Sequence, residues 1–254
     1  MRNYVQPRFL VAIVAVLVLV SGCEISDKTA PYPRVLRDLV FTDGKNESQY
    51  LIWLAENGTD VPYLVLTDNY EGTNMCLLLR KHTLETPMRF HVNQPYSAYY
   101  PECELDHFLN HDFLANFPDT LDICQAPVRV TGWSSLGVCG KQIETISRKV
   151  FLLSAMEVFG RSSTTLLQEG SHLDYFSSES RRIAKNTTGA SMTWWLRTPN
   201  TWYDNIICGV SIDGVVALGS AGGVLGENLS GVRPAFCLSG DTPIYYREGR
   251  FYIS

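Results

Sequence analysis

Three apolar runs separated by turn-forming residues fill the segment between residues 50 and 84. The runs read YLIWLA, VPYLVLTD and MCLLLRKH, and the connections after the first two contain ENGTD and NYEGTN. The Asn57-Gly58 pair in the first connection is typical of a two-residue hairpin turn, because both residue types readily adopt positive φ. We therefore predict consecutive antiparallel β-strands in this part of the chain.

The hydrophobic period changes at residues 103–117, CELDHFLNHDFLANF. Apolar residues recur there at helical spacing: Leu105, Phe108, Leu109, Phe113 and Phe117. Polar residues occupy the other positions and are expected to point away from the core: Asp106, His107, Asn110 and His111. We predict an amphipathic helix of about three turns. His107 and His111 have the i, i+4 spacing of a metal-binding pair, but the Glu of an HExxH motif is missing, so we interpret both as residues of a solvated face.

Later segments repeat the pattern of short apolar runs and turns. KVFLLSAMEVF predicts a strand followed by a helix, with Ser154 as N-cap and Glu157 completing a capping box. Asp213-Gly214 and Glu248-Gly249 each separate two apolar runs and predict two more hairpins. The whole pattern indicates an α+β domain that is mostly antiparallel β, with one to three helices.

The first residues predict export. Residues 9–20 are twelve consecutive apolar residues behind Arg2 and Arg8, which is the pattern of a signal peptide and is too short for a bilayer span. Val20-Ser21-Gly22-Cys23 resembles a bacterial lipobox, which implies diacylation of Cys23, and an uncleaved anchor is the alternative. We expect a signal peptide at 1–22, a lipidated tether at 23–40 and a single domain at 41–254. The expected location is extracytoplasmic, with the protein anchored to the membrane by lipid.

Charge and cysteine content narrow the expected partners. Without Arg2 and Arg8 the chain keeps 19 basic against 26 acidic residues, which argues against a nucleic-acid partner. Besides Cys23 there are six cysteines: Cys76, Cys103, Cys124, Cys139, Cys208 and Cys237. In an exported protein they are either disulfides, with 15 arrangements open, or buried thiols. Because no CxxC occurs, we expect no zinc ribbon, and we expect no metal or cofactor.

Two motifs close the chain, WWLRTP at 194–199 and GVRPAF at 231–236. With VPYLVLTDN, the predicted helix and KVFLLSAMEVFG, their order resembles a family of uncharacterised bacterial domains with WWLRSP-type and GVRPA-type motifs, in which Ser usually stands where Thr198 stands here. That family is similar to the C-type lectin-like fold of formylglycine-generating oxidases and retroelement variable proteins. The resemblance implies an irregular lectin-like fold over roughly residues 50–240.

The resemblance also implies roles for these residues. The Trp-rich and Arg-rich strands would pair near the centre of a small sheet. Trp194 and Trp195 would fill the core, because large aromatic side chains bury the most area. Arg197 and Arg233 would be partly buried and paired with carbonyls or carboxylates, because an unpaired buried charge is costly.

The segment 199–230 is where such a fold displays its variable loops. We therefore predict ligand-binding residues in it, since Trp and Tyr give rigid contact area and Asn and Asp adapt by hydrogen bonding. The candidates are Trp202, Tyr203, Asp204, Asn205 and Asn228, with Asn200 of the same type. A calcium-dependent sugar site is not expected, because no Glu-Pro-Asn or Gln-Pro-Asp tripeptide occurs.

The sequence is compatible with three functions. The first is a non-catalytic cell-surface binding module for an extracellular protein or glycan. The second is an oxidoreductase of the formylglycine-generating type, for which the cysteines nearest the closing strand are Cys208 and Cys237, 29 residues apart in apolar sequence. The third is a structural component of the envelope without a small-molecule ligand.

Overall fold

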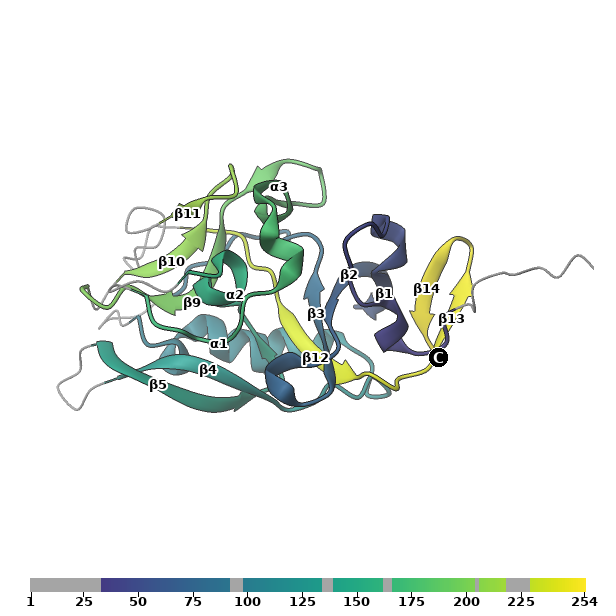
Figure 1. Cartoon of the computed structure of the whole chain (residues 1–254), viewed down its shortest axis with the longest axis horizontal. Coiled ribbons are helices and arrows are strands. Elements are labelled where there is room, and N and C mark those ends of the chain that lie inside the picture. Colours follow the sequence, from purple (N-terminus) through teal and green to yellow (C-terminus); the bar gives the residue numbers. More distant parts are fainter. Residues whose placement is uncertain (1–32, 92–97, 134–138, 162–165, 204–205, 218–228) are drawn as a thin grey trace, which may run out of the picture. The chain divides into compact units, whose positions relative to one another are not determined.

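The computed structural model describes residues 33–91, 98–133, 139–161, 166–203, 206–217 and 229–254, without the side chains of residues 139 and 141 (Figure 1). The described residues belong to one compact unit that begins at Pro33. The predicted signal peptide and Cys23 lie outside the described residues. None of the helices described has the length and apolar character of a membrane span.

A seven-stranded sheet forms the larger part of the fold. Its strands, in spatial order, are β13 (Ile244–Arg247), β14 (Arg250–Ile253), β1 (Leu51–Glu56), β2 (Thr59–Thr67), β3 (Met75–Arg80), β12 (Ala235–Ser239) and β6 (Val150–Phe151). Neighbouring strands are antiparallel except for the pair of β1 and β14, which is parallel. The first and the last strand of the described chain, β1 and β14, therefore lie side by side.

Smaller sheets and short helices complete the domain. The remaining sheets contain β11 (Val216–Ala217), β10 (Ile207–Val210) and β9 (Trp194–Pro199); β4 (Ala126–Trp133) and β5 (Cys139–Arg148); and β7 (Ala184–Lys185) and β8 (Ser191–Met192). The α-helices are α1 (Glu104–Phe108), α2 (Ala155–Phe159) and α3 (Glu179–Arg182). Short 3₁₀ turns cover Leu36–Leu39, Glu47–Gln49, Tyr70–Gly72, Tyr100–Glu102, Leu114–Asn116 and Asp174–Ser177. The predicted α+β class, mostly antiparallel with few helices, is confirmed.

The local signals in the sequence predicted their turns correctly. Asn57 and Gly58 have φ of 51° and 73° between β1 and β2, as a two-residue hairpin of this type requires. Glu248 and Gly249 have φ of 52° and 81° between β13 and β14. Ser154 caps α2, where its hydroxyl accepts a hydrogen bond from the Glu157 N–H at 3.0 Å.

The predicted helix at 103–117 is confirmed as one helical segment, but it is not regular. α1 continues into a π-helical turn at Leu109–Phe113 and a 3₁₀ turn at Leu114–Asn116. The placement of Asn110 on the solvated face was wrong, because its side-chain amide bonds to the backbone of Lys149 and Val150. The placement of Asp106 on that face was also wrong. Its carboxylate is buried and pairs with the Arg148 guanidinium at 2.8 Å, while His107 and His111 are exposed as predicted.

Two further expectations need correction. β9 and β12 lie in different sheets. The two closing motifs meet instead at a parallel bridge between Trp194 and Gly231, which precedes β12. Residues 34–40 are also part of the domain rather than tether: Leu36 and Leu39 are fully buried. The backbone of residues 34–36 bonds to residues 242–244 beside β13.

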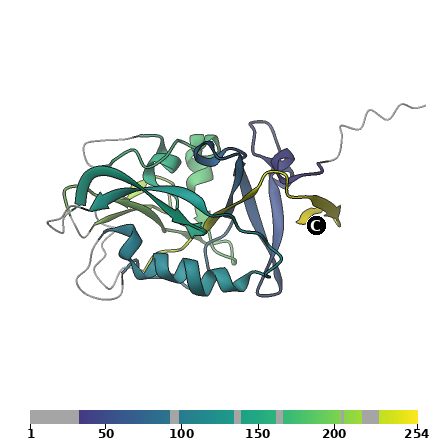
Figure 2. The ribbon, with the colours of Figure 1, turned by 90° about the horizontal axis from the view of Figure 1, so that it is seen from below.

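The first described residues and the β9–β10 connection lie at opposite ends of the domain. In Figures 1 and 2, β13, β14 and the first described residues lie at one end. The described start of the β9–β10 connection, the end of β4 and the start of β5 lie at the other end. The chain therefore joins the domain at the end opposite to the β9–β10 turn.

Candidate functional site

The WWLRTP segment forms β9, and all six of its residues are buried. Trp194 and Trp195 fill the core as predicted, and each indole N–H donates to a carbonyl, that of Arg182 at 3.0 Å and that of Met88 at 2.8 Å. A buried indole needs such an acceptor, since an unpaired buried donor is costly. The two indoles are therefore structural residues.

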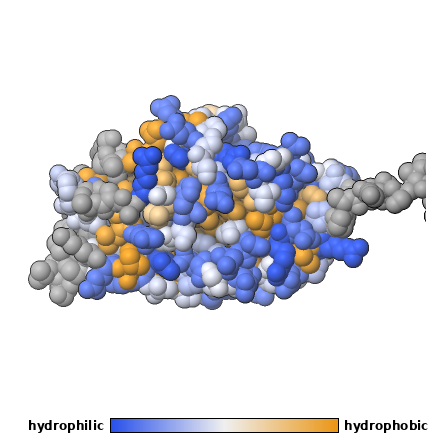
Figure 3. Space-filling model, in the orientation of Figure 1, coloured by the Kyte–Doolittle hydropathy of each residue, from blue (hydrophilic) through white to orange (hydrophobic). Residues whose placement is uncertain are grey.

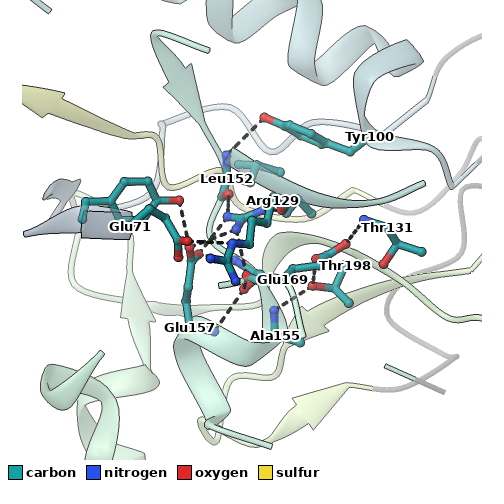
Figure 4. A network of polar contacts seen from close by, with 12 residues as sticks. Glu71, Tyr100, Arg129, Thr131, Leu152, Ala155, Glu157, Glu169 and Thr198 are labelled. Atoms are coloured by element: carbon teal, nitrogen blue, oxygen red, sulfur yellow. Dashed lines mark hydrogen bonds and ion pairs between the residues drawn. The ribbon is translucent and has the colours of Figure 1, made fainter. Parts of the chain in front are cut away.

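Figure 4 shows a network of polar contacts around Glu157 and Glu169. Arg197, which is fully buried, is its centre. Its guanidinium makes a two-pronged ion pair with Glu157, with N–O distances of 2.8 and 2.9 Å. It also donates to the carbonyls of Arg129, Leu152 and Glu169 at 2.6–3.0 Å. The predicted pairing of Arg197 with carbonyls and a carboxylate is thus confirmed, and the residue joins α2 to β4 and β9.

Glu169 is a second fully buried carboxyl in this network. It accepts hydrogen bonds from the Thr131 N–H and from the Thr198 hydroxyl, which in turn accepts from the Ala155 N–H at 2.8 Å. Burial raises the pKa of Glu169, although Arg197 opposes the shift. The Thr198 hydroxyl therefore links the Glu169 carboxyl to the backbone at the start of α2.

The network is sealed from solvent. The side chains of Arg197 and Glu157 are 0% and 1% exposed. The Glu157 oxygen that accepts from Arg197 Nη2 also accepts a hydrogen bond from the Tyr70 hydroxyl at 2.9 Å. A carboxylate pair without access for a substrate holds the elements together and does not act as a general acid and base.

Arg233 differs from Arg197, although both are buried. Its donors reach the carbonyls of Arg80 and Lys81 at 3.2 and 3.3 Å, and its guanidinium lies over the Trp194 ring at 4.8 Å. Nη1 has no hydrogen-bond partner in the described part of the chain, and burial lowers the pKa of Arg233 to about 10. The expected pairing of Arg233 is therefore met by carbonyls and by an aromatic face.

Gly231 of the GVRPAF motif has a steric role. A Cβ there would lie 2.6 Å from Thr83 Cγ2 and 2.9 Å from the Thr193 carbonyl oxygen. The close approach permits the Gly231 N–H to donate to Thr193 at 2.8 Å and its carbonyl to accept from Trp195 at 3.0 Å. The two closing motifs therefore meet at a position that only glycine fits.

The β9–β10 turn carries the two predicted ligand-binding residues that the structure describes. Trp202 is 68% exposed and Tyr203 is 56% exposed. Asn200 does not belong to the exposed set: it is buried, and its side-chain oxygen accepts from the Trp202 N–H at 2.9 Å. Asp204, Asn205 and Asn228 lie outside the described residues.

The turn is closed by its own backbone. The Asn200 N–H donates to the Ile206 carbonyl at 2.8 Å, and the Tyr203 N–H donates to the Asn200 carbonyl at 3.3 Å. The sequence could not distinguish Asn200 from its neighbours, since all are polar or aromatic. Its buried side chain fixes the backbone of the turn at Trp202.

The other candidates give no catalytic or metal geometry within the described residues. The rings of His107 and His111 stack at 4.0 Å, and no group of three or more potential ligands forms a metal site there. Cys208 and Cys237 are free thiols in different sheets, and burial raises the pKa of both. Cys76, Cys103 and Cys124 are also free, while the Cys139 side chain lies outside the description.

A family model described as a domain of unknown function, DUF6273, matches residues 73–240, about two thirds of the chain. The chain belongs to the DUF6273 family. The expectation of an uncharacterised domain family is thereby confirmed. No curated protein and no solved structure matches the chain.

The DUF6273 range begins just before β3 and ends just after β12. It contains β9, the Arg197 network and the β9–β10 turn. The β1–β2 and β13–β14 hairpins lie outside it, although they extend the same seven-stranded sheet. The sheet of this DUF6273 protein is therefore completed by strands on both sides of the family range.

Proposed function

We propose that the protein is an exported, lipid-anchored binding module that recognises an extracellular protein or glycan through the β9–β10 turn. The observation that carries the proposal is the exposed pair Trp202 and Tyr203 on a turn held by the buried side chain of Asn200. A turn whose backbone is fixed before binding loses less conformational entropy on binding, and exposed aromatic residues dominate recognition surfaces.

The position of the turn supports this proposal. The chain joins the domain beside β13, at the end opposite to the β9–β10 turn (Figures 1 and 2). With acyl chains on Cys23, nine residues would separate the lipidated Cys23 from Pro33, and this stretch would span about 35 Å when extended. A ligand outside the cell would then meet the turn without obstruction by the anchor.

The distribution of hydrophobic residues on one face of the domain also bears on the kind of binding. On the face shown in Figure 3, hydrophobic residues occur in small groups between hydrophilic ones and do not form one continuous patch. Large apolar patches mark obligate protein contacts, whereas a few aromatic anchors suit reversible recognition. We also propose that the fold is C-type lectin-like. Proteins of that fold display their variable binding loops in the segment that corresponds to residues 199–230.

The test is a binding screen of residues 24–254 against glycans and extracellular proteins, repeated with a Trp202→Ala/Tyr203→Ala variant. We expect the double variant to lose at least about 30-fold in affinity for any ligand found, because the loss of even one hot-spot aromatic costs about 2 kcal/mol. Thermal unfolding should stay unchanged, because both side chains are exposed.

A Tyr245→Ala/Tyr246→Ala variant is the matched control, because it removes two exposed aromatic residues from the opposite end of the domain. Equal binding by both double variants would refute the proposed face. A folded protein that binds nothing in the screen would favour a structural envelope component. The formylglycine-type alternative gains no support from Cys208 and Cys237, because the two thiols are buried in separate sheets.

A further inference from the structure

A groove of about 700 Å³ lies between the β1–β2 hairpin, the segment that follows β3 and the helical segment 104–116. Its apolar wall consists of Val61, Pro62, Leu84, Met88, Phe108 and Phe113. We call it the hairpin groove. Its volume falls within the range of small-molecule sites, which combine an apolar lining with a few charged groups.

The π-helical turn shapes the apolar wall. Phe108 and Phe113 are five residues apart, and in a regular α-helix they would point roughly 140° away from each other. The π turn at Leu109–Phe113 brings position i+5 close to position i, so the two rings lie 6.5 Å apart and both line the groove. π-Helical turns are frequent at functional sites, so the turn supports a ligand-binding role for the groove.

An ion pair closes the floor of the groove. Arg80 donates to both carboxylate oxygens of Glu56 at 3.0 and 3.1 Å, and its remaining nitrogen donates to the His82 and Thr83 carbonyls. The Tyr63 hydroxyl donates to Glu56 at 2.6 Å. Both charges of the floor are therefore used within the protein, and the floor offers a ligand no net charge.

The rim is acidic. Asp60 and Glu85 line the groove, both are exposed, and neither forms an ion pair with any residue in the described part of the chain. The Asp60 carboxylate accepts from the Tyr252 hydroxyl at 3.2 Å, which leaves its charge in place. Burial and the neighbouring Lys81 lower the pKa of His82, so this lining residue adds no positive charge at neutral pH.

We propose that the hairpin groove binds an organic cation, with its apolar group against Phe108, Leu84 and Met88 and its ammonium beside Asp60 and Glu85. Aromatic faces also attract a cation directly. The groove is separate from the β9–β10 turn, so the inference goes beyond the function proposed above and stands or falls independently. The wall from β2 lies outside the DUF6273 range, so the site forms where the added hairpin meets the family domain.

Three probes with one phenylethyl group and different ends test the charge preference: 2-phenylethylamine, 2-phenylethanol and 3-phenylpropionate. Binding to residues 24–254, which contain the whole compact unit, is measured by calorimetry and by NMR shifts. We expect 2-phenylethylamine to bind with Kd of about 0.1–1 mM, and the other two probes to bind more weakly. Equal binding of the three, tighter binding of the anion, or no binding of the amine would each overturn the proposal.

Variants assign the binding to this groove. Asp60→Asn/Glu85→Gln should weaken binding of the amine about fivefold and leave the alcohol unaffected, because two exposed charges are lost. Asp119→Asn/Glu102→Gln makes the same change of net charge at exposed positions outside the groove lining, and it should not alter binding. Equal effects of the two double variants would mean that only net charge matters and would also overturn the site.

Discussion

Replacing Glu157 by Gln tests the Arg197 network most directly. Four donors surround the Glu157 carboxylate: Arg197 Nη1, Arg197 Nη2, the Ser154 N–H and the Tyr70 hydroxyl. Gln keeps the shape of Glu but carries an NH₂ group, which must face one of these donors. The Arg197 charge also stays buried without its counterion, because no other carboxylate forms an ion pair with it in the described residues.

The expected cost follows from these contacts. Removing one partner of a buried ion pair destabilises a protein by about 3–5 kcal/mol. Because a domain of this size loses about 2–4 °C in Tm for each kcal/mol, Tm should fall by about 6–20 °C. Total stabilities are about 5–15 kcal/mol, so this single substitution removes a large fraction.

Urea unfolding of residues 24–254, followed by circular dichroism, measures the change in the free energy of unfolding. Glu102→Gln is the matched control, since Glu102 is exposed and its substitution should change stability by less than about 0.5 kcal/mol. A loss below about 1 kcal/mol for Glu157→Gln would refute the reasoning, because it would mean that the buried charges do not depend on each other.

Two further predictions concern a buried carboxyl and the proposed anchor. Because burial raises the pKa of Glu169, the folded protein takes up a proton more readily than the unfolded chain, so stability is lost as pH rises from about 4.5 through the raised pKa. Glu169→Gln lacks this loss, and its stability relative to the parent should increase with pH in urea titrations; a constant difference would contradict this. Cys23→Ser should move the protein from the membrane fraction to the soluble fraction, because two acyl chains give stable anchoring, and retention at the membrane would disprove the lipobox interpretation.

Local structure could be predicted from the sequence, because its signals lie within a few residues. Asn57-Gly58 predicted its turn, and Ser154 with Glu157 predicted the start of α2. Pairings between distant segments could not be predicted in the same way. The burial of Asp106 depends on Arg148, 42 residues away, and no period in the helix reveals that partner.

The site was predicted in part for the same reason. Trp202 and Tyr203 were identified by residue type, and their exposure agrees with that choice. The hairpin groove was missed, because its walls come from segments far apart in the sequence. Phe108 and Phe113 looked like two members of one core stripe, and only the π turn places both at the groove.

The parallel pairing of β1 with β14 has a consequence for how the chain matures. Trp53 in β1 lies opposite Tyr252 in β14, about two hundred positions further along. A ribosome releases residues in order, so one edge of β1 stays open until β14 emerges. Such late long-range contacts slow folding and leave unpaired strand edges available for aggregation. The same delay keeps the sheet incomplete while the chain is being made. A nascent chain cut short before β14 would expose that edge of β1 permanently.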